Sequence, residues 1–329
     1  MIAYLAARLW QGAIVLLAVI AIAFVMFTFL GDPVVAILGA DSTADARAAV
    51  RRELGLDRPM PLQSLDFLGR VLQGEFGISY RLGRPVEAIL VERIPATVEL
   101  ALSGMALAVG LGIPLGIYTA LRRRSAGAQA LLGVSLIGIS VPSFFVGIVL
   151  IWVFSVTLDL LPSFGRGETV AIGWWSTGLL TASGLRSLLL PAVTIAVFQV
   201  AMMLRLVRAE MLEVLRRDFI RFARARGLAN RLVHFHHALR NALMPVVTIT
   251  GLQLGSVIAF AVITEQVFQW PGLGLLFLQS VAAADVPMMT AYLVLIAALF
   301  VVINLAVDLL YLVIDPRLRA REGFEAMRR

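Results

Sequence analysis

Few side chains in this sequence could do chemistry, and four of them lie within or beside long apolar runs. Gln199, Gln253 and Asn304 stand inside uncharged runs, and Glu265 directly follows one. Polar groups are costly to place in hydrocarbon, so each is a candidate for a functional role. The three amides could line a path for a polar solute or hydrogen bond to a neighbouring helix, and we favour the second role. Glu265 could meet a substrate or face water. All four are kept as candidate pathway residues.

The side chains that usually bind metals or perform catalysis are scarce. The chain has no cysteine, which excludes disulfides, thiolate metal sites and thiol nucleophiles. His234 and His237 would share a helical face beside His236, but no carboxylate lies near them in the sequence. We therefore predict no metal site and no catalytic residue. The sequence also contains no GxxxxGK[ST] run, the pattern that holds nucleotide phosphates.

The composition shows what must position these residues. Of the 329 residues, 60% are hydrophobic and 15% are charged, whereas soluble proteins average about 45–50% and about 25%. One soluble core could not hide this much apolar surface, so the composition predicts a polytopic membrane protein. Uncharged or nearly uncharged runs predict six spans, at residues 9–30, 96–121, 125–158, 187–204, 241–264 and 286–307.

Arginine placement predicts the orientation of these spans. All 28 basic residues are arginines, and with six spans 18 of them lie on the side that holds both termini. The short loops on the opposite side hold only Arg166 and Arg186. Basic residues mark the cytoplasmic side, so both termini are predicted to be cytoplasmic. The net charge of +7 thus reflects topology, and no nucleic-acid partner is expected.

Three segments lie between the spans. Residues 31–95 are predicted to be extracytoplasmic, with a helix over 42–54 capped by Ser42 and an amphipathic stretch over 62–72. A structural cap is at least as well supported for them as a direct substrate role. Residues 169–185 are uncharged and contain Trp174 and Trp175, so we expect them to lie on the membrane surface, with a seventh span as the alternative. The cytoplasmic segment 206–240 contains a predicted amphipathic helix that Gly227 ends in a left-handed conformation.

The helix before Gly227 has two possible roles on composition alone. It could lie on anionic lipid headgroups or dock onto a partner protein, and its composition slightly favours the lipid. The motif Arg221-Phe222-Ala223, followed by Gly227 and by His237-Ala238-Leu239-Arg240-Asn241-Ala242-Leu243-Met244-Pro245, bears on this choice. It resembles the cytoplasmic loop signature of ABC importer permeases of the dipeptide, oligopeptide and nickel family.

Further stretches of the chain resemble the same family in order and spacing. They are Leu54-Gly55-Leu56-Asp57-Arg58-Pro59, Gly74-Glu75-Phe76-Gly77, Arg93-Ile94-Pro95-Ala96-Thr97-Val98-Glu99-Leu100, Gly112-Ile113-Pro114-Leu115-Gly116, Glu265-Gln266-Val267-Phe268-Gln269-Trp270-Pro271-Gly272-Leu273-Gly274 and Asp315-Pro316-Arg317. The loop departs from the family pattern, with Phe219 and Phe222 where Tyr and Thr are usual. Arg226 stands in place of a Lys, and His236 in place of an Arg. Docking is expected to survive these changes, whereas the choice of partner could change.

The resemblance implies a fold and a division of the chain. The fold would be the all-α type I ABC importer fold, with six transmembrane helices and an extracytoplasmic segment between the first two. Residues 1–30 would hold the cytoplasmic N-terminus and first helix, and 31–95 the extracytoplasmic segment. Residues 96–314 would form the ABC transmembrane domain with its coupling loop at 206–240, and 315–329 a cytoplasmic tail.

The resemblance also implies a function. The chain would be a non-catalytic subunit in a bacterial inner membrane, forming half of a peptide pathway that works by alternating access. Its partners would be the lipid bilayer, a homologous second permease, an extracytoplasmic binding protein and two ATPase subunits that bind ATP and Mg. Nickel, opines, glutathione and oligosaccharides are alternative substrates, and an ATPase-independent secondary transporter is the alternative class. The implied ATPase-coupling residues are Arg221, Phe222, Ala223, Arg224, Ala225, Arg226 and Gly227.

Overall fold

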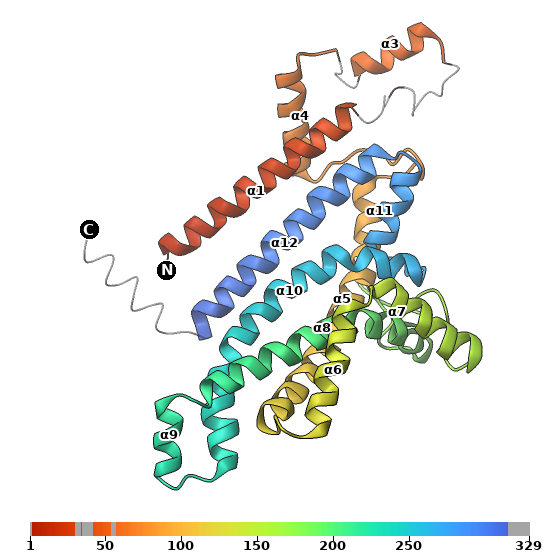
Figure 1. The fold of residues 1–329 in the computed structure, drawn as a ribbon. Coiled ribbons are helices and arrows are strands. Elements are labelled where there is room, and N and C mark those ends of the chain that lie inside the picture. The colour runs from red at the N-terminus through yellow and green to blue at the C-terminus, as the bar shows by residue number, and fades with distance from the viewer. Residues whose placement is uncertain (1, 30–33, 35–41, 54–56, 315–329) are drawn as a thin grey trace.

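Long apolar helices form most of the structure, a computed structural model that describes residues 2–29, 34, 42–53 and 57–314. Five helices are long and apolar enough to cross a membrane, and a bent pair can form a sixth span. Figure 1 shows the elements, and η denotes a π-helix. In chain order the elements are α1 (Ile2–Phe29), α3 (Ala44–Glu53), α4 (Met60–Gln73), α5 (Val86–Leu121), α6 (Ala126–Ser140), α7 (Ser143–Leu150), η1 (Ile151–Thr157), β1 (Val170–Ile172), β2 (Trp175–Thr177), α8 (Ala182–Val214), α9 (Asp218–Ala225), η2 (Leu232–Ala238), α10 (Leu239–Val267), α11 (Leu273–Ala282) and α12 (Val286–Ile314).

The third predicted span is the bent pair. α6 ends at Ser140 and α7 begins at Ser143. The chain bends by 106° between Ala126–Ser140 and Ser143–Thr157. Pro142 explains the break, because it has no amide hydrogen to donate and forces the residue before it out of the helical region. Val141 accordingly has the extended dihedrals φ −85° and ψ 127°. Residues 125–158 are therefore not one straight span.

The other spans extend beyond their apolar runs, and α5 and α8 do so most clearly. α5 begins at Val86 rather than at residue 96, and α8 continues to Val214 rather than ending at residue 204. Hydropathy marks the part of a helix that can cross hydrocarbon, whereas hydrogen bonding and capping decide where the helix ends. The helices continue through Pro95, Pro114, Pro191 and Pro245.

Helices α5 and α8 form the centre of the bundle through small residues on α5. A Cβ atom added at Gly112 would lie 2.6 Å from Cβ of Met203, and one at Gly116 would lie 2.6 Å from Cβ of Val207. Backbones can approach this closely only where a side chain is missing, which is the usual way that helices associate in membranes.

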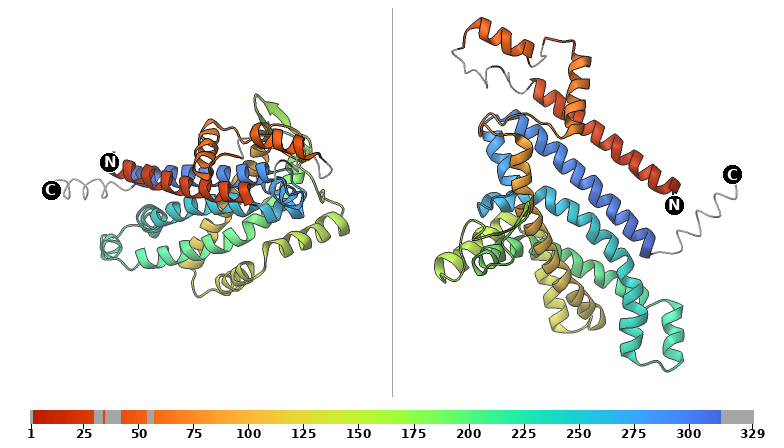
Figure 2. Two further views of the ribbon diagram at one scale, coloured as in Figure 1. Left: turned by 90° about the horizontal axis from the view of Figure 1, so that it is seen from above. Right: turned by 180° about the vertical axis from the view of Figure 1, so that it is seen from behind.

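The N-terminal part packs on the other side of the bundle. Both views of Figure 2 show α1 beside α12. α4 folds onto α1, with the ring of Phe67 lying 5.7 Å from that of Phe24 and 5.8 Å from that of Phe27. The predicted amphipathic stretch at 62–72 is thus confirmed as a helix.

Between the spans, one prediction needs correction and one alternative is excluded. The cap of α3 is Thr43 rather than Ser42, because the amide of Ala46 donates to Thr43 Oγ1 over 3.4 Å, and Ser42 accepts from Arg47 instead. The predicted end of this helix at Leu54 and the tail 315–329 lie outside the described residues. A seventh span at 169–185 is wrong, because β1 and β2 form an antiparallel hairpin there, with Ala171 opposite Ser176.

Candidate functional site

A buried ion pair attaches the hairpin to α5. Glu99 is 3% exposed and lies inside the apolar face of α5, where it meets Arg166 from the segment before β1. Arg166 Nε donates to Glu99 Oε2 over 3.0 Å, and Thr177 and Gly178 donate to Oε1 over 2.9 and 3.0 Å. Arg166 also donates to the carbonyl of Ser176 over 2.7 Å. Every charge in this cluster is matched, so the hairpin is held rigidly on the helix.

Glu265 lies in a second buried junction, with 0% exposure. Its Oε1 accepts from Thr97 Oγ1 over 2.6 Å, and its Oε2 accepts from the amide of Leu275 over 2.9 Å. Trp270 Nε1 completes the junction by donating to the carbonyl of Ala96 over 2.8 Å. A carboxylate at the start of α11 satisfies amides that have no partner within the helix. Glu265 therefore ties α10 and α11 to α5, and its side chain is closed off from the surface of the subunit.

Asp285, which lies between α11 and α12, forms a third junction. It is 1% exposed, and its oxygens accept from the hydroxyl of Ser79 and from the amide of Tyr80 over 3.1 Å. These bonds attach the turn before α5 to the segment between α11 and α12. Buried carboxylates thus hold three connections of this side of the bundle in place.

Gln199 and Gln253 line one cavity of about 520 Å³ at the α6–α7 break. Gln199 comes from α8 and Gln253 from α10, and neither side chain hydrogen bonds to any described residue. The described part of this subunit thus gives neither side chain a partner on a neighbouring helix, and the favoured role of bonding between helices stays a prediction for these two residues. The other polar side chains that line the cavity are Ser140, Ser143, Ser256 and Thr264.

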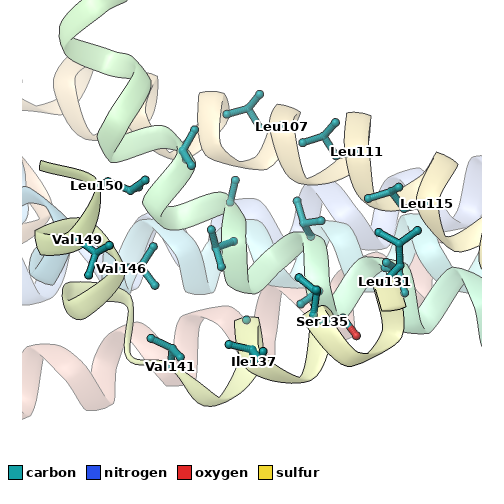
Figure 3. Close-up of a pocket in the computed structure, with 18 of the residues that line it drawn as sticks. Leu107, Leu111, Leu115, Leu131, Ser135, Ile137, Val141, Val146, Val149 and Leu150 are labelled. Carbon is teal, nitrogen blue, oxygen red and sulfur yellow. The ribbon is translucent and has the colours of Figure 1, made fainter. Parts of the chain in front are cut away.

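An apolar cavity of about 510 Å³ lies on the other side of the break, and Val141 lines both cavities. Figure 3 shows its walls, which come from α5, α6, α7 and α8 and include Leu107, Leu115 and Ile137. Ser135 is its one polar side chain, and its hydroxyl donates to the carbonyl of Leu132 over 2.7 Å. This cavity can hold apolar groups, whereas the 520 Å³ cavity offers donors and acceptors.

Asn304 lies apart from the other candidates, in a cavity of about 590 Å³ between α1, α10 and α12. Its Oδ1 is buried and has no hydrogen-bond partner among the residues that the structure describes. Arg8 and Asp308 line the same cavity and form an ion pair with a distance of 3.1 Å between Nε and Oδ2. The four candidate pathway residues thus divide between this cavity, the α6–α7 break and the Glu265 junction.

Helix α9 lies within the predicted coupling loop, and Gly227 terminates it, as predicted. Gly227 has φ +75°, its amide donates to the carbonyl of Arg224 over 2.9 Å, and the amide of Leu228 donates to the carbonyl of Ala223 over 3.3 Å. This left-handed ending is the one that favours glycine. Figure 1 shows α9 at one end of the molecule, far from α4 and α11.

The two faces of α9 differ sharply. Ala223 is 7% exposed and packs with Ile220 and Val233 inside this subunit, whereas Phe222 is 64% exposed. The guanidinium of Arg226 lies 5.7 Å from the ring of Phe222. Except for Ala223, the residues of the predicted coupling set are exposed: Arg221, Phe222, Arg224, Ala225, Arg226 and Gly227. Ala223 joins the helix to the bundle and cannot belong to an outward docking face.

The histidines lie in η2, on the return from α9. The rings of His236 and His237 are 5.2 Å apart and perpendicular. Within the described residues, no group of three or more His, Cys, Asp or Glu side chains could hold a metal ion. The side-chain amide of Asn241 in α10 donates to the carbonyl of His237 in η2 over 2.7 Å and so joins these two consecutive helices.

Comparison with known proteins identifies the family. A model described as "Binding-protein-dependent transport system inner membrane component" matches residues 112–320, and a model of the N-terminal part of such components matches residues 1–101. The chain belongs to this family. It is a permease subunit of a binding-protein-dependent importer, as the resemblance predicted.

Relatives of this permease extend over nearly its whole length. A putative peptide transport system permease protein of Brucella abortus (strain 2308) is 37% identical over 322 residues, which are 97% of this chain and 99% of the relative. The dipeptide transport system permease protein DppB of Escherichia coli (strain K12) is 36% identical over 323 residues, covering 92% of this chain and 95% of DppB.

A solved structure shares the fold of the permease. An inward-facing conformation of the MetNI methionine ABC transporter has a chain with a TM-score of 0.52 and 20% identity, covering 69% of this chain and 96% of that one. The predicted type I ABC importer fold is confirmed.

Sequence reasoning missed the partners of the buried carboxylates, although signals for them were present. Glu99 is the single charge inside its predicted span, and Arg166 is one of two arginines in the short loops on the same side. A buried charge needs a partner, which points each of these residues to the other. Ser256 follows Gln253 by three positions and therefore shares its face of α10.

Proposed function

We propose that this permease forms half of a pathway for peptides in an ABC importer that works by alternating access. The observation that carries the proposal is the construction of α9. Its outer face exposes Phe222 and Arg226, and its inner face packs through Ile220 and Ala223 against α8 and η2. A partner that binds the outer face can therefore move α8 and α10, because close-packed elements transmit displacement.

The energy for this movement comes from other chains. The sequence has no phosphate-binding run, so we assign ATP and Mg to two cytoplasmic ATPase subunits and no catalysis to this chain. A homologous second permease completes the pathway, and an extracytoplasmic binding protein delivers the substrate. The exposed residues of the coupling set, from Arg221 to Gly227, form the contact with one ATPase subunit.

The orientation follows from charge. We place the chain in a bacterial inner membrane with both termini and α9 in the cytoplasm, because 18 of the 28 arginines belong to that side. In Figure 1 the start of α1, the end of α12 and α9 lie toward one end of the molecule, and α4 and α11 toward the other. The three carboxylate junctions would then stabilise the outer side, where the binding protein docks.

Peptides are the substrate that the relatives favour, since the relatives described above are named for peptide or dipeptide transport. Nickel, opines, glutathione and oligosaccharides remain outcomes that an uptake experiment can distinguish. The most direct identification is mass spectrometry of the ligand that the binding protein retains.

Two neighbouring alanines provide a test of the coupling contact. We expect Ala225→Cys to crosslink to a cysteine placed in an ATPase subunit, because Ala225 is exposed. Ala223→Cys is the matched control and should not crosslink, because Ala223 faces the core of this subunit. If Ala225→Cys gives no crosslink although the ATPase subunits co-purify, α9 lies on lipid and the coupling role is wrong. If no ATPase subunit co-purifies at all, a secondary transporter is favoured.

A further inference from the structure

We propose that the cavity at the α6–α7 break is a contact site for the backbone of a short peptide during its passage through this subunit. The inference rests on the proposed function and deepens it. It assigns a place and a chemistry to the substrate within the chain, at the cavity that Gln199, Gln253, Ser143, Ser256 and Thr264 line.

Five of the six polar side chains that line this cavity have no hydrogen-bond partner among the described residues, and the sixth, Ser140, donates to the carbonyl of Leu136 over 2.9 Å. Gln199 is 9% exposed, and its amide makes no hydrogen bond to any described residue. The same holds for the side chains of Gln253, Ser143, Ser256 and Thr264 in the described part of the chain. A polar group inside a membrane bundle without a partner is costly. Five such groups around one cavity indicate that water or a polar solute satisfies them.

The lining of the cavity is polar but uncharged. The 14 side chains around the cavity include no Asp, Glu, Arg or His. Amides and hydroxyls both donate and accept hydrogen bonds, so they match the N–H and C=O groups that every peptide carries, whatever its side chains. A divalent metal ion such as nickel would find neither carboxylate nor imidazole here.

The break between α6 and α7 places the start of a helix in the wall of the cavity. Pro142 ends the ladder of hydrogen bonds of α6, and α7 begins at Ser143 in the cavity wall. The positive end of a helix dipole favours a negative group, and broken helices use this property in other transport proteins. The unpartnered Gln199 amide lines the same cavity, so the carboxylate end of a peptide would find donors from both α7 and α8.

The volume of the cavity suits a small molecule. A volume of about 520 Å³ lies within the range of about 300–1,000 Å³ that is typical of small-molecule sites. Ile195, Phe198, Val257 and Phe260 belong to the apolar part of the lining and can contact side chains of different shapes without selecting among them. Selectivity would then remain with the binding protein.

The first experiment measures uptake and stability of the complete complex. The variants are Gln199→Leu and Gln253→Leu, reconstituted in proteoliposomes with the second permease, the ATPase subunits and the binding protein. ATP-driven uptake of a mixture of di- and tripeptides, followed by mass spectrometry, should fall about tenfold, as expected for the loss of one or two hydrogen bonds to the substrate. The melting temperature should stay the same or rise, because no hydrogen bond within the protein is lost.

The matched control is Gln266→Leu, the same change on an exposed position of α10 outside the cavity. It should transport like the parent complex. Parent-like uptake by both cavity variants would overturn the site, and so would a lowered melting temperature with loss of the second permease, because the glutamines would then form a subunit interface. If the parent complex itself imports no peptide, the proposed function is wrong rather than the site alone.

The second experiment detects binding directly in the absence of the binding protein. The chain has no cysteine, so Ser256→Cys introduces a single thiol into the cavity. A charged methanethiosulfonate should modify it, and millimolar trialanine should slow this modification at least about threefold, as a ligand does when it occupies most of its sites. Modification that trialanine leaves unchanged would overturn the proposal.

Discussion

Buried carboxylates in this protein act as attachment points. Glu99, Glu265 and Asp285 each accept at least one hydrogen bond from a segment distant in the sequence. Among the described residues, only Glu99 is bonded to an arginine side chain; hydroxyl groups and backbone amides donate to the other two carboxylates. A charge in this setting is stable only while all of its partners are present, so these sites should tolerate substitution poorly.

Removing one partner of the Glu99–Arg166 pair tests this idea. Arg166→Leu leaves the carboxylate of Glu99 buried without its cation, and we expect the subunit to lose about 3–5 kcal/mol of stability. Thermal unfolding of the purified complex measures the loss. The double variant Glu99→Gln/Arg166→Leu should recover part of it, because no unpaired charge remains.

The control is the exposed pair between Arg84 and Glu92, whose side chains are each 53% exposed. Arg84→Leu should leave the melting temperature unchanged, because water screens this pair. Equal effects of Arg84→Leu and Arg166→Leu would show that burial of the Glu99 pair does not contribute to stability.

The backbone at Gly227 supports a second prediction. A Cβ atom at this position would meet no atom within 4 Å, so any cost comes from φ +75°, which is about 1–2 kcal/mol for a residue with a side chain. Gly227→Val should still insert and pair with the second permease, but it should lose ATP hydrolysis stimulated by the binding protein. Asn tolerates left-handed dihedrals, so Gly227→Asn should retain most of the coupling. Parent-like hydrolysis by Gly227→Val would contradict the coupling role.

At the scale of elements, the contact between α5 and α8 explains the family's glycine-rich stretch at Gly112–Gly116. Both glycines touch α8, whereas Gly110 on the same helix has no atom within 4 Å of an added Cβ. The glycines therefore differ in function although the sequence alone does not distinguish them. A close helix–helix approach in a membrane depends on which small residues face the partner helix.

This difference gives a matched pair of variants. Gly116→Ala would place its Cβ 2.6 Å from Cβ of Val207 and 2.9 Å from the carbonyl of Leu204, so we expect it to push the helices apart and to cost about 1–3 kcal/mol. Gly110→Ala should be neutral or stabilising by up to about 1 kcal/mol, because alanine favours the helix. Melting temperatures of the two purified variants decide the point, and equal values would argue against close packing at Gly116.

At the scale of the whole molecule, cysteine labelling tests the orientation. Leu82→Cys and Glu168→Cys lie at exposed positions on the side that we assign to the exterior, and Arg123→Cys and Ala229→Cys at exposed positions on the opposite side. A membrane-impermeant maleimide should label the first two on spheroplasts and the other two only after lysis. Ser79 is unsuitable although it belongs to the outer side, because it is fully buried against Asp285. Labelling of Ala229→Cys before lysis would overturn the topology.

Properties that depend on local composition and local backbone geometry could be predicted from the sequence alone. Apolar runs located five long helices and the bent third span, because hydrocarbon must be crossed by about 20 apolar residues wherever they come in the chain. The left-handed Gly227 was also predictable, since the ending of a helix depends on a few neighbouring residues. The ordered motifs predicted the family, which the comparisons confirmed.

Which residues come into contact could be read only from the folded arrangement of the helices. It paired Glu99 with Arg166, and it brought Gln199 and Gln253 to one cavity while Asn304 and Glu265 lie elsewhere. It also turned Ala223 inward and left Ala225 exposed. Hydropathy gives the depth of a residue along a span, but the rotation of each helix about its axis depends on packing against its neighbours. Because that packing joins residues distant in the chain, no local pattern in the sequence specifies it.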